Sequence, residues 1–247
     1  MSVLESGLTD STSLAVRGLH GRVRALARLL LRNTFRFALW ALPIGWLVTR
    51  VNLMRHSHLT DRRLEIGPGD DRVDDFETLD VILRRNVDYV ADASRRLPFK
   101  DATFQVVYAS HILEHIPWYR LEETLREWIR IIKPGGVLEI WVPNGLEICR
   151  VFVDYETTGQ DRTDQDGWYR FNSDKDPCLW AAGRIFTYGD GHGELRSPNW
   201  HRAIFSPRFL QELMTKVGLV DVHEMDRADV RGYDHGWINL GFRGSKR

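Results

Sequence analysis

The stretch Arg63–Asp70, Arg-Leu-Glu-Ile-Gly-Pro-Gly-Asp, constrains the fold more than any other part of this chain. Its short apolar run contains an acidic residue, Glu65, and is followed by two glycines, Gly67 and Gly69, with one residue between them. A buried parallel strand that ends in a tight turn has this pattern, and glycine there lets a ligand lie against bare backbone. Gly-x-Gly is also common in ordinary turns, so these residues alone predict a strand and a turn and leave the ligand open.

Further strand signals follow at short intervals. Apolar segments predict strands over residues 78–82, 87–91, 104–109 and 137–142, with an amphipathic helix over 118–132 before the last of them. About ten residues separate Gly69 from Asp80, which leaves room for a loop but not for a full crossover helix. This order of elements predicts an α/β fold with a Rossmann-like, mostly parallel sheet and flanking helices.

The C-terminal part returns to the same alternation. Ser206 is a good N-cap before Pro207, the helix continues to residue 217, and Gly218 ends it. Residues 219–224 and 237–242 predict two closing strands, an antiparallel pair at one edge of the sheet. Residues 147–203 show no sustained period, so we expect an irregular insertion that acts as a lid or a binding loop.

Charge is unevenly distributed along a chain whose formal net charge is zero. Residues 11–60 hold eight arginines and no acidic residue, and four of them recur every four residues: Arg24, Arg28, Arg32 and Arg36. We therefore expect a basic amphipathic helical arm over residues 1–60 and one domain over 61–247. Because the body of the chain is mildly acidic, we expect no nucleic-acid partner.

Two interpretations of the arm stay open. Residues 14–50 can lie on an anionic membrane surface through Trp40, Trp46 and the arginines, or they can form a helix that covers the domain core. The uncharged run 37–49 is broken by Pro43 and is too short to span a bilayer. We therefore expect a cytoplasmic protein, either free or at the inner membrane surface.

The sequence predicts no metal site. Cys149 and Cys178 match no metal or redox spacing and fit a reducing compartment. His56 and His58 form a His-Ser-His pair, but no third ligand is apparent near them in the sequence.

Polar residues follow the predicted strands where each one ends. At this edge of an open α/β sheet ligands bind. A carboxylate at the end of the second strand can accept both hydroxyls of a ribose, and residues after the third can meet an adenine edge. Any one of these residues could also be an ordinary turn residue. Their order along the chain favours a single nucleotide-type ligand. The residues are Glu65, Gly67 and Gly69 at the end of the first strand, Asp80 at the end of the second, Asp92 and Ala93 after the third, and Ser110 and His111 after the fourth.

This ordered set resembles the class I S-adenosylmethionine-dependent methyltransferases. More narrowly, it is similar to the type 11 methyltransferase domain and to small methyltransferases often associated with glycan and cell-envelope biosynthesis. The resemblance is carried by residues 64–69, 78–80, 90–93, 97–104, 109–115 and 133–140, and more loosely by 200–242. It implies S-adenosyl-L-methionine as the cofactor, held by Glu65, Gly67, Pro68, Gly69, Asp80, Asp92, Ala93, Ser110 and His111.

Two departures from dinucleotide-binding patterns argue against NAD. The first motif lacks a third glycine, and the segment before Asp80 is short, whereas a pyrophosphate needs a helix N-terminus. S-adenosylmethionine carries no phosphate and has no such need. The short segment leaves Glu77 as an alternative ribose partner.

The resemblance implies methyl transfer, and for a hydroxyl acceptor a nearby base helps. We expect His111 first, His201 second and His192 third in this role, and a structural role for His115 before Pro117. Aromatic residues in the insertion can stack on a sugar or simply anchor a long loop: Trp168, Tyr169, Trp180, Tyr188 and Trp200. The expected function is O-methylation of a small-molecule or glycan-linked hydroxyl. The alternative is a non-catalytic binding module on the same fold, and the oligomeric state is not predicted.

Overall fold

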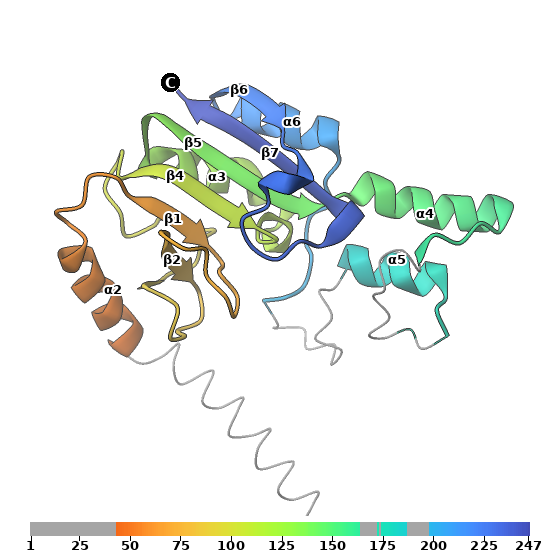
Figure 1. Cartoon of the computed structure of the whole chain (residues 1–247), viewed down its shortest axis with the longest axis horizontal. Coiled ribbons are helices and arrows are strands. Elements are labelled where there is room, and N and C mark those ends of the chain that lie inside the picture. Colours follow the sequence, from red (N-terminus) through yellow and green to blue (C-terminus); the bar gives the residue numbers. More distant parts are fainter. Residues whose placement is uncertain (1–42, 164–171, 173, 187–197) are drawn as a thin grey trace, which may run out of the picture. The chain divides into compact units, whose positions relative to one another are not determined.

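The computed structural model describes residues 43–163, 172, 174–186 and 198–247 (Figure 1). The chain divides into two compact units, Met1–Leu47 and Val48–Arg247, whereas the sequence suggested an arm over residues 1–60 and a domain over 61–247. His192 and three of the five insertion aromatics, Trp168, Tyr169 and Tyr188, lie outside the described residues. No helix among the described residues is long and apolar enough to cross a membrane.

The domain is built on one seven-stranded sheet with the order β3-β2-β1-β4-β5-β7-β6. The strands are β1 (Arg63–Ile66), β2 (Glu77–Asp80), β3 (Tyr89–Val90), β4 (Phe104–Ser110), β5 (Ile132–Pro143), β6 (Leu219–Glu224) and β7 (Asn239–Lys246). The first five are parallel, and β7 runs antiparallel between β5 and β6. This confirms the predicted mostly parallel sheet with an antiparallel edge.

The helices are α2 (Pro43–Arg55), α3 (Leu121–Ile131), α4 (Gly145–Thr158), α5 (Pro177–Phe186) and α6 (Pro207–Lys216), with short 3-10 turns η1 (Leu113–His115), η2 (Trp118–Arg120), η4 (Arg227–Asp229) and η5 (Gly236–Ile238). Two features confirm the expected cap and loop. Ser206 caps α6 by accepting from the Phe209 N–H, and β1 passes to β2 through a loop with no helix. Pro43 begins a helix, where the sequence suggested a break.

The insertion 147–203 is more regular than its sequence suggested. It contains most of α4 and all of α5, joined through a small core of buried residues that includes Val151, Trp180 and Ile238. Its hydrophobic pattern is hard to recognise because these helices bury only a few residues each, against one another and against the turn before β7. The prediction of an irregular segment was therefore wrong for residues 147–158 and 177–186.

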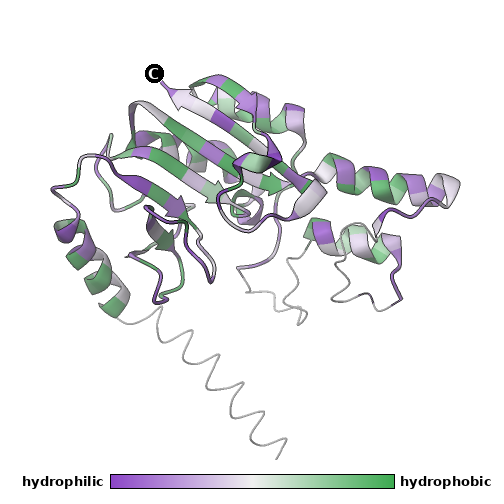
Figure 2. Ribbon diagram, in the orientation of Figure 1, coloured by the Kyte–Doolittle hydropathy of each residue, from purple (hydrophilic) through white to green (hydrophobic). Residues whose placement is uncertain are grey.

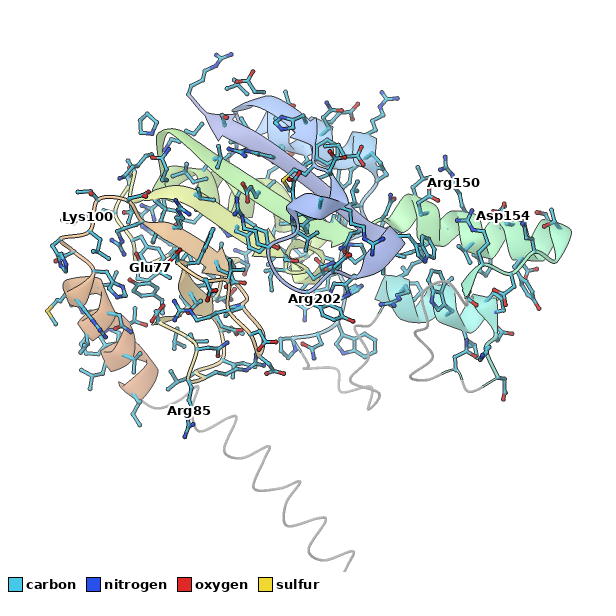
Figure 3. The ribbon with its side chains drawn as sticks, viewed as in Figure 1. Glu77, Arg85, Lys100, Arg150, Asp154 and Arg202 are labelled. Atoms are coloured by element: carbon cyan, nitrogen blue, oxygen red, sulfur yellow. The ribbon has the colours of Figure 1, made fainter. Side chains whose placement is uncertain are left out.

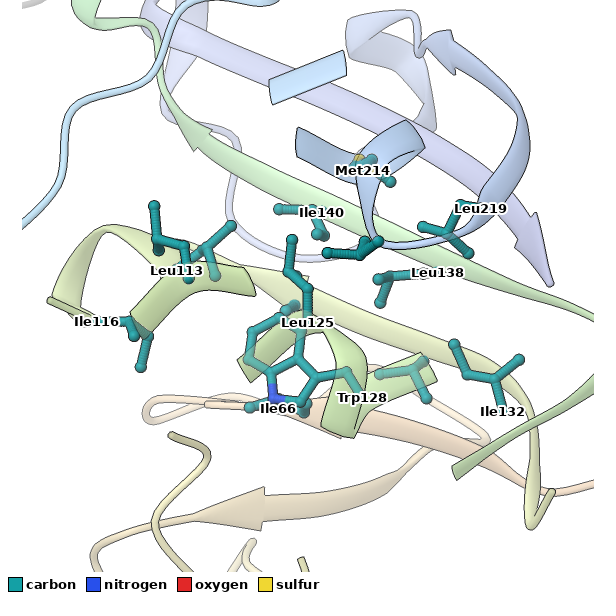
Figure 4. Packing of buried hydrophobic residues seen from close by; sticks show 14 of the residues in the cluster. Ile66, Leu113, Ile116, Leu125, Trp128, Ile132, Leu138, Ile140, Met214 and Leu219 are labelled. Atoms are coloured by element: carbon teal, nitrogen blue, oxygen red, sulfur yellow. The ribbon is translucent and has the colours of Figure 1, made fainter. Parts of the chain in front are cut away.

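The main core lies between one face of the sheet and the helices α3 and α6. Trp128 and Leu125 of α3 and Met214 of α6 pack on Ile66, Leu138 and Ile140 of the central strands (Figure 4). Of the central strands, β4 is mostly hydrophobic along its length (Figure 2), as expected for a strand buried on both faces of a sheet. On the opposite face, Tyr108 and Trp141 contact Phe76 and Val230, which belong to loops.

The parallel strands all have their carboxyl ends on the same side of the sheet, and loops follow them there. The candidate site lies on this side, which is called the carboxyl edge of the sheet. The parallel register puts Ile66, Asp80, Val90 and Ser110 at the carboxyl ends of their strands. Because β7 is antiparallel, its first residue, Asn239, pairs with Pro143 at the same edge. The end of β4 and the start of β7 are thus brought together, although they are far apart in the sequence.

Candidate functional site

The loop after β1 is held close to its neighbours by backbone contacts. The N–H of Gly67 donates to the Leu79 carbonyl at 2.8 Å, and Asn86 Nδ2 donates to the Gly69 carbonyl at 3.1 Å. Both glycines have positive φ, +75° and +64°, a region that favours glycine. A Cβ on Gly67 would lie 1.9 Å from Ile112 Cδ1, whereas one on Gly69 would meet nothing within 4 Å.

Glu65 sits just before this loop and holds it. Its Oε2 accepts the Val73 N–H at 2.8 Å, and burial raises the pKa of this carboxyl above its ordinary value. The structure therefore places Glu65 as a support for the loop 67–76, at the end of the strand where the sequence expected a cofactor contact.

Asp80 and Asp92 offer carboxylates at successive strand ends. Burial raises the pKa of Asp80; its Oδ1 accepts the Ile82 N–H at 2.8 Å, and its Oδ2 lies 4.0 Å from Arg84. Asp92 Oδ1 accepts from the N–H and the hydroxyl of Ser94, and although burial opposes it, these bonds hold the pKa of Asp92 below its ordinary value. The Ala93 carbonyl accepts the Trp128 indole N–H at 2.9 Å, which anchors this segment on α3.

These residues fit S-adenosylmethionine better than a phosphate-bearing ligand. Asp80 presents a partly desolvated carboxylate, the acceptor that a ribose diol needs, and the space next to the Gly69 Cα is open. The described loop 67–76 carries no helix whose N-terminus could receive a pyrophosphate. Carboxylates at the strand ends and the lack of an anion site in the described loop favour an uncharged or cationic nucleoside as the ligand.

Glu77, the alternative ribose partner, lies at the opposite edge of the sheet. It is the first residue of β2, whereas Asp80 is the last. Its oxygens accept from Arg62 Nε and Nη2 at 2.7 and 2.8 Å and from the Tyr89 hydroxyl. Figure 3 labels Glu77 beside β1 and β2, well apart from Arg202 at the other edge. This alternative is therefore wrong, and Asp80 is left as the ribose partner to test.

His111 follows β4 and is fixed by two side chains. It adopts a positive φ of 54°, and its side chain is buried. Its Nε2 lies 2.8 Å from Asn239 Oδ1, and Asn239 Nδ2 in turn donates to Asp234, which orients the amide. Its Nδ1 lies 3.2 Å from Glu114 Oε1. Both ring nitrogens thus face oxygen atoms, and because the Asn239 oxygen can only accept, Nε2 is the donor in this contact. Nε2 therefore has to leave Asn239 and lose its own proton before it can take one from an acceptor.

Glu114 is the centre of a cluster that the sequence did not single out. It is 1% exposed, and neither carboxylate oxygen makes a well-aligned hydrogen bond to a described residue, although Oε1 is at ion-pair distance from His111. Burial acts to raise the pKa of Glu114, but His111, His115 and His201 outweigh it and lower that pKa to about 2. The carboxylate is therefore ionised at neutral pH.

His201 joins this cluster from the chain that leads out of the insertion. The backbone N–H groups of Arg202 and Ala203 donate to the Glu114 carbonyl at 2.7 and 3.2 Å. Burial lowers the pKa of His201 to about 4, so its imidazole is neutral at pH 7. The two histidines expected as bases, His111 and His201, thus meet around one buried carboxylate.

His235 is a second imidazole that sequence reasoning missed. Its ring lies 3.7 Å from the His111 ring, centroid to centroid, with the planes inclined by 35°. Burial, foremost, and then the neighbouring His111 and Arg184 side chains lower the pKa of His235 to about 3. It reaches this edge on the loop between β6 and β7, which Arg231 ties to buried Glu139 of β5 at 2.8 and 3.1 Å. No local sequence signal marks such a position.

Comparison with known proteins gives one domain match. Residues 72–140 match a family model described as a methyltransferase domain. Among curated proteins, the sterol 4-C-methyltransferase strm-1 of Caenorhabditis elegans is 43% identical over 47 residues, which is 19% of this chain and 14% of that protein. The chain thus matches only a small part of that relative.

Two solved structures illustrate the structural likenesses. A methyltransferase from Thermotoga maritima, described as a possible histamine N-methyltransferase, is 20% identical, with 87% of this chain and 97% of that chain covered and a TM-score of 0.41. The 1,6-didemethyltoxoflavin-N1-methyltransferase of Burkholderia thailandensis, solved with S-adenosylhomocysteine, is 15% identical, with 90% and 89% covered and a TM-score of 0.41. At such TM-scores these likenesses carry no argument about the acceptor.

Proposed function

We propose a hydroxyl acceptor for this chain, which belongs to the class I S-adenosylmethionine-dependent methyltransferases by its domain match, its strand order and its ordered motifs. The acceptor class is a small molecule or a glycan-linked sugar. The cofactor supplies an activated methyl group on a sulfonium, so the protein mainly has to align the acceptor, exclude water and receive a proton.

The cofactor end of the site is assigned to the strand ends of the first half. Asp80 holds the ribose hydroxyls, and Asp92 with Ala93 meets the adenine. The loop of Gly67, Pro68 and Gly69 lies under the methionine part, with Glu65 as its support. Ser110 and His111 flank the methyl group. The support for this assignment is that these residues share one edge of the sheet and that Asp80 is partly desolvated there.

The observation that carries the hydroxyl acceptor is that two imidazoles lie close together beyond the end of β4, His111 and His235, with ring centroids 3.7 Å apart. A hydroxyl is a weak nucleophile, so removal of its proton during attack favours transfer. His111 can serve in this role once Nε2 is released from Asn239 without its proton, because buried Glu114 lies against Nδ1 and stabilises the imidazolium that forms when Nε2 takes a proton from the hydroxyl. An acceptor hydroxyl would take the place of Asn239 at Nε2.

The alternative is a module that binds the cofactor or a partner without turnover. The short similarity to a sterol C-methyltransferase lies within 19% of this chain and supports no particular acceptor. Transfer to a defined acceptor separates the two, because a non-catalytic module would bind the cofactor and release no S-adenosylhomocysteine.

Calorimetric titration with S-adenosylmethionine tests the cofactor assignment. We expect Asp80→Asn to weaken binding by about 10- to 100-fold, because hydrogen bonds to a charged group contribute about 1.5–3 kcal/mol. Asp61→Asn is the matched control, since Asp61 is exposed before the start of β1. Equal affinity of the two variants would contradict the role of Asp80.

Methyl transfer from labelled cofactor then tests the acceptor. Sugars and small alcohols are compared with their amino analogues, and the label is traced to oxygen or nitrogen. We expect transfer to a hydroxyl and loss of at least about tenfold in turnover for His111→Gln. Transfer to the amines alone would refute the hydroxyl acceptor, and cofactor binding without any transfer would favour the module.

We also propose that residues 14–50 contact anionic membrane. The support is the sequence, in which arginines recur every four residues beside two tryptophans.

A further inference from the structure

We propose that Glu114, His115 and His201 bind a divalent transition-metal ion, a site that goes beyond the methyl-transfer function and does not depend on it. One ligand atom from each of the three residues lies within 4.8 Å of the other two. Glu114 and His115 lie in η1, and His201 lies near the end of the insertion, 86 residues after His115. The sequence predicted no metal ligands, because this set forms only in the folded chain.

Glu114 points to an ion because its burial is not offset by hydrogen bonds. Its side chain is 1% exposed, and neither oxygen makes a well-aligned hydrogen bond to a described residue. A buried carboxylate costs several kcal/mol unless it is paired or coordinates a metal. The ion-pair contact with His111 at 3.2 Å satisfies part of one oxygen only. A cation between Glu114 and the two other imidazoles would satisfy the rest.

The two histidines are held as metal-ligating histidines are. Nδ1 of His115 lies 3.3 Å from the Trp200 carbonyl, and Nδ1 of His201 lies 3.0 Å from the Arg184 carbonyl. Only an N–H group can face a carbonyl oxygen, so Nδ1 carries a proton in both rings and Nε2 is the nitrogen that could coordinate an ion. A backbone carbonyl bound to the second ring nitrogen is the usual way in which a ligating imidazole is oriented.

The backbone keeps the ligands together without a metal. The N–H groups of Arg202 and Ala203 donate to the carbonyl of Glu114, and the N–H of His201 donates to the Phe186 carbonyl at 3.0 Å. The rings of His115 and His201 meet edge to face, 5.0 Å between centroids. These contacts reduce the ordering that binding requires, because the three residues are already neighbours.

The donor set indicates the class of metal. Two imidazoles and one carboxylate suit Zn²⁺ or Fe²⁺, whereas Ca²⁺ and Mg²⁺ prefer sites made of oxygen. Three protein ligands leave at least one coordination position for water or for an atom of an acceptor. Zn²⁺ is the probe of choice because it is not redox-active, and Co²⁺ adds a spectroscopic readout.

The test is Zn²⁺ titration of the full chain after chelator treatment, in the absence of S-adenosylmethionine. We expect one Zn²⁺ per chain, a raised melting temperature, and an affinity at least about 100-fold weaker in Glu114→Gln and in His201→Gln. The matched control is His223→Gln, because His223 is exposed on β6 and contacts only its own strand backbone among the described residues.

Two readouts keep the outcome clear. With Co²⁺, the wild-type protein and the control should show visible absorption bands that both variants lack. If Glu114→Gln does not fold, as judged by circular dichroism, His201→Gln decides. Binding of Zn²⁺ by His201→Gln as tight as in the wild type, or no binding by the wild type, would overturn the proposal. Neither result bears on the cofactor titration, so failure here leaves the methyltransferase assignment standing.

Discussion

At the scale of single residues, Gly67 shows that a motif glycine can be required by the protein as much as by a ligand. Its positive φ excludes most side chains, and Ile112 occupies the space that a Cβ would need. Ile112 follows His111, so the turn after β1 and the turn after β4 fit against each other at this point. Gly69 shares the backbone conformation, but the space beside it is open.

The two glycines therefore predict different costs for the same change. We expect Gly69→Ala to lower the free energy of unfolding by about 1–2 kcal/mol through backbone strain alone. Gly67→Ala should add about 1–3 kcal/mol of overpacking against Ile112. Urea unfolding measures both, and the added cost should disappear when Ile112→Ala is combined with Gly67→Ala. Equal effects of the two glycine variants would contradict this account.

The sequence predicts those site residues that directly follow a strand, and it does not predict those that reach the site through long loops. Asp80, Asp92 and His111 directly follow strands, so a strand prediction already puts them at one edge. Asn239 and His235 reach that edge through a long loop and an antiparallel strand, which no local pattern reveals. The motif His-Ile-Leu-Glu-His at 111–115 was visible, but its chemistry depends on His201, whose approach only the folded chain shows.

At the scale of secondary-structure elements, one buried cluster joins the start of the sheet. Arg62 before β1 pairs with Glu77 of β2, and the hydroxyl of Tyr89 from β3 completes the contact. His56, after α2, lies 3.0 Å from the same carboxylate. Burial acts to raise the pKa of Glu77, but the hydrogen bonds from Arg62 and Tyr89 outweigh it and lower that pKa below its ordinary value of 4.5.

This shift predicts a pH dependence of stability with a definite sign. A carboxyl whose pKa is lower in the folded state contributes stability above its unfolded pKa and loses it as pH falls through the folded value. The wild type should therefore be more stable than Glu77→Gln above about pH 5, and this difference in the free energy of unfolding should shrink as the pH is lowered toward about 3. The range follows from the ordinary pKa of 4.5 and the lower pKa of Glu77 in the folded protein. Denaturant unfolding across this range measures it.

At pH 7 the same variant should lose about 3–5 kcal/mol, because Arg62 would stay buried without its partner. Glu212→Gln is the control, since its ion pair with Arg208 is exposed and should change stability by less than about 1 kcal/mol. A pH-independent difference between wild type and Glu77→Gln would show that the pair is not responsible.

At the scale of the whole molecule, the chain combines a strongly basic N-terminal segment with a mildly acidic remainder. The net charge of zero conceals this asymmetry, since residues 11–60 hold eight arginines and no acidic residue. Each basic residue near an anionic bilayer contributes about 1 kcal/mol to the free energy of membrane binding. Arginines clustered in one segment can therefore bind the bilayer together, whereas dispersed arginines cannot.

We expect the full chain to bind vesicles that contain anionic lipid and to leave neutral ones in solution. Replacing four arginines by glutamine should reduce sedimentation with anionic vesicles by at least about tenfold: Arg24, Arg28, Arg32 and Arg36. The control replaces four exposed arginines of the domain: Arg95, Arg126, Arg150 and Arg208. Equal losses in both variants would indicate a general charge effect and not a membrane-binding segment.

The position of β7 has a consequence for how the protein is made. Residues 239–246 form a strand in the interior of the sheet, between β5 and β6, and the first residue of that strand holds His111. During synthesis, β1 to β5 leave the ribosome with the β5 edge still unpaired. Synthesis of the next 100 or so residues takes about 5–20 s at 5–20 residues per second. Only after this delay can β7 complete the sheet and Asn239 contact His111.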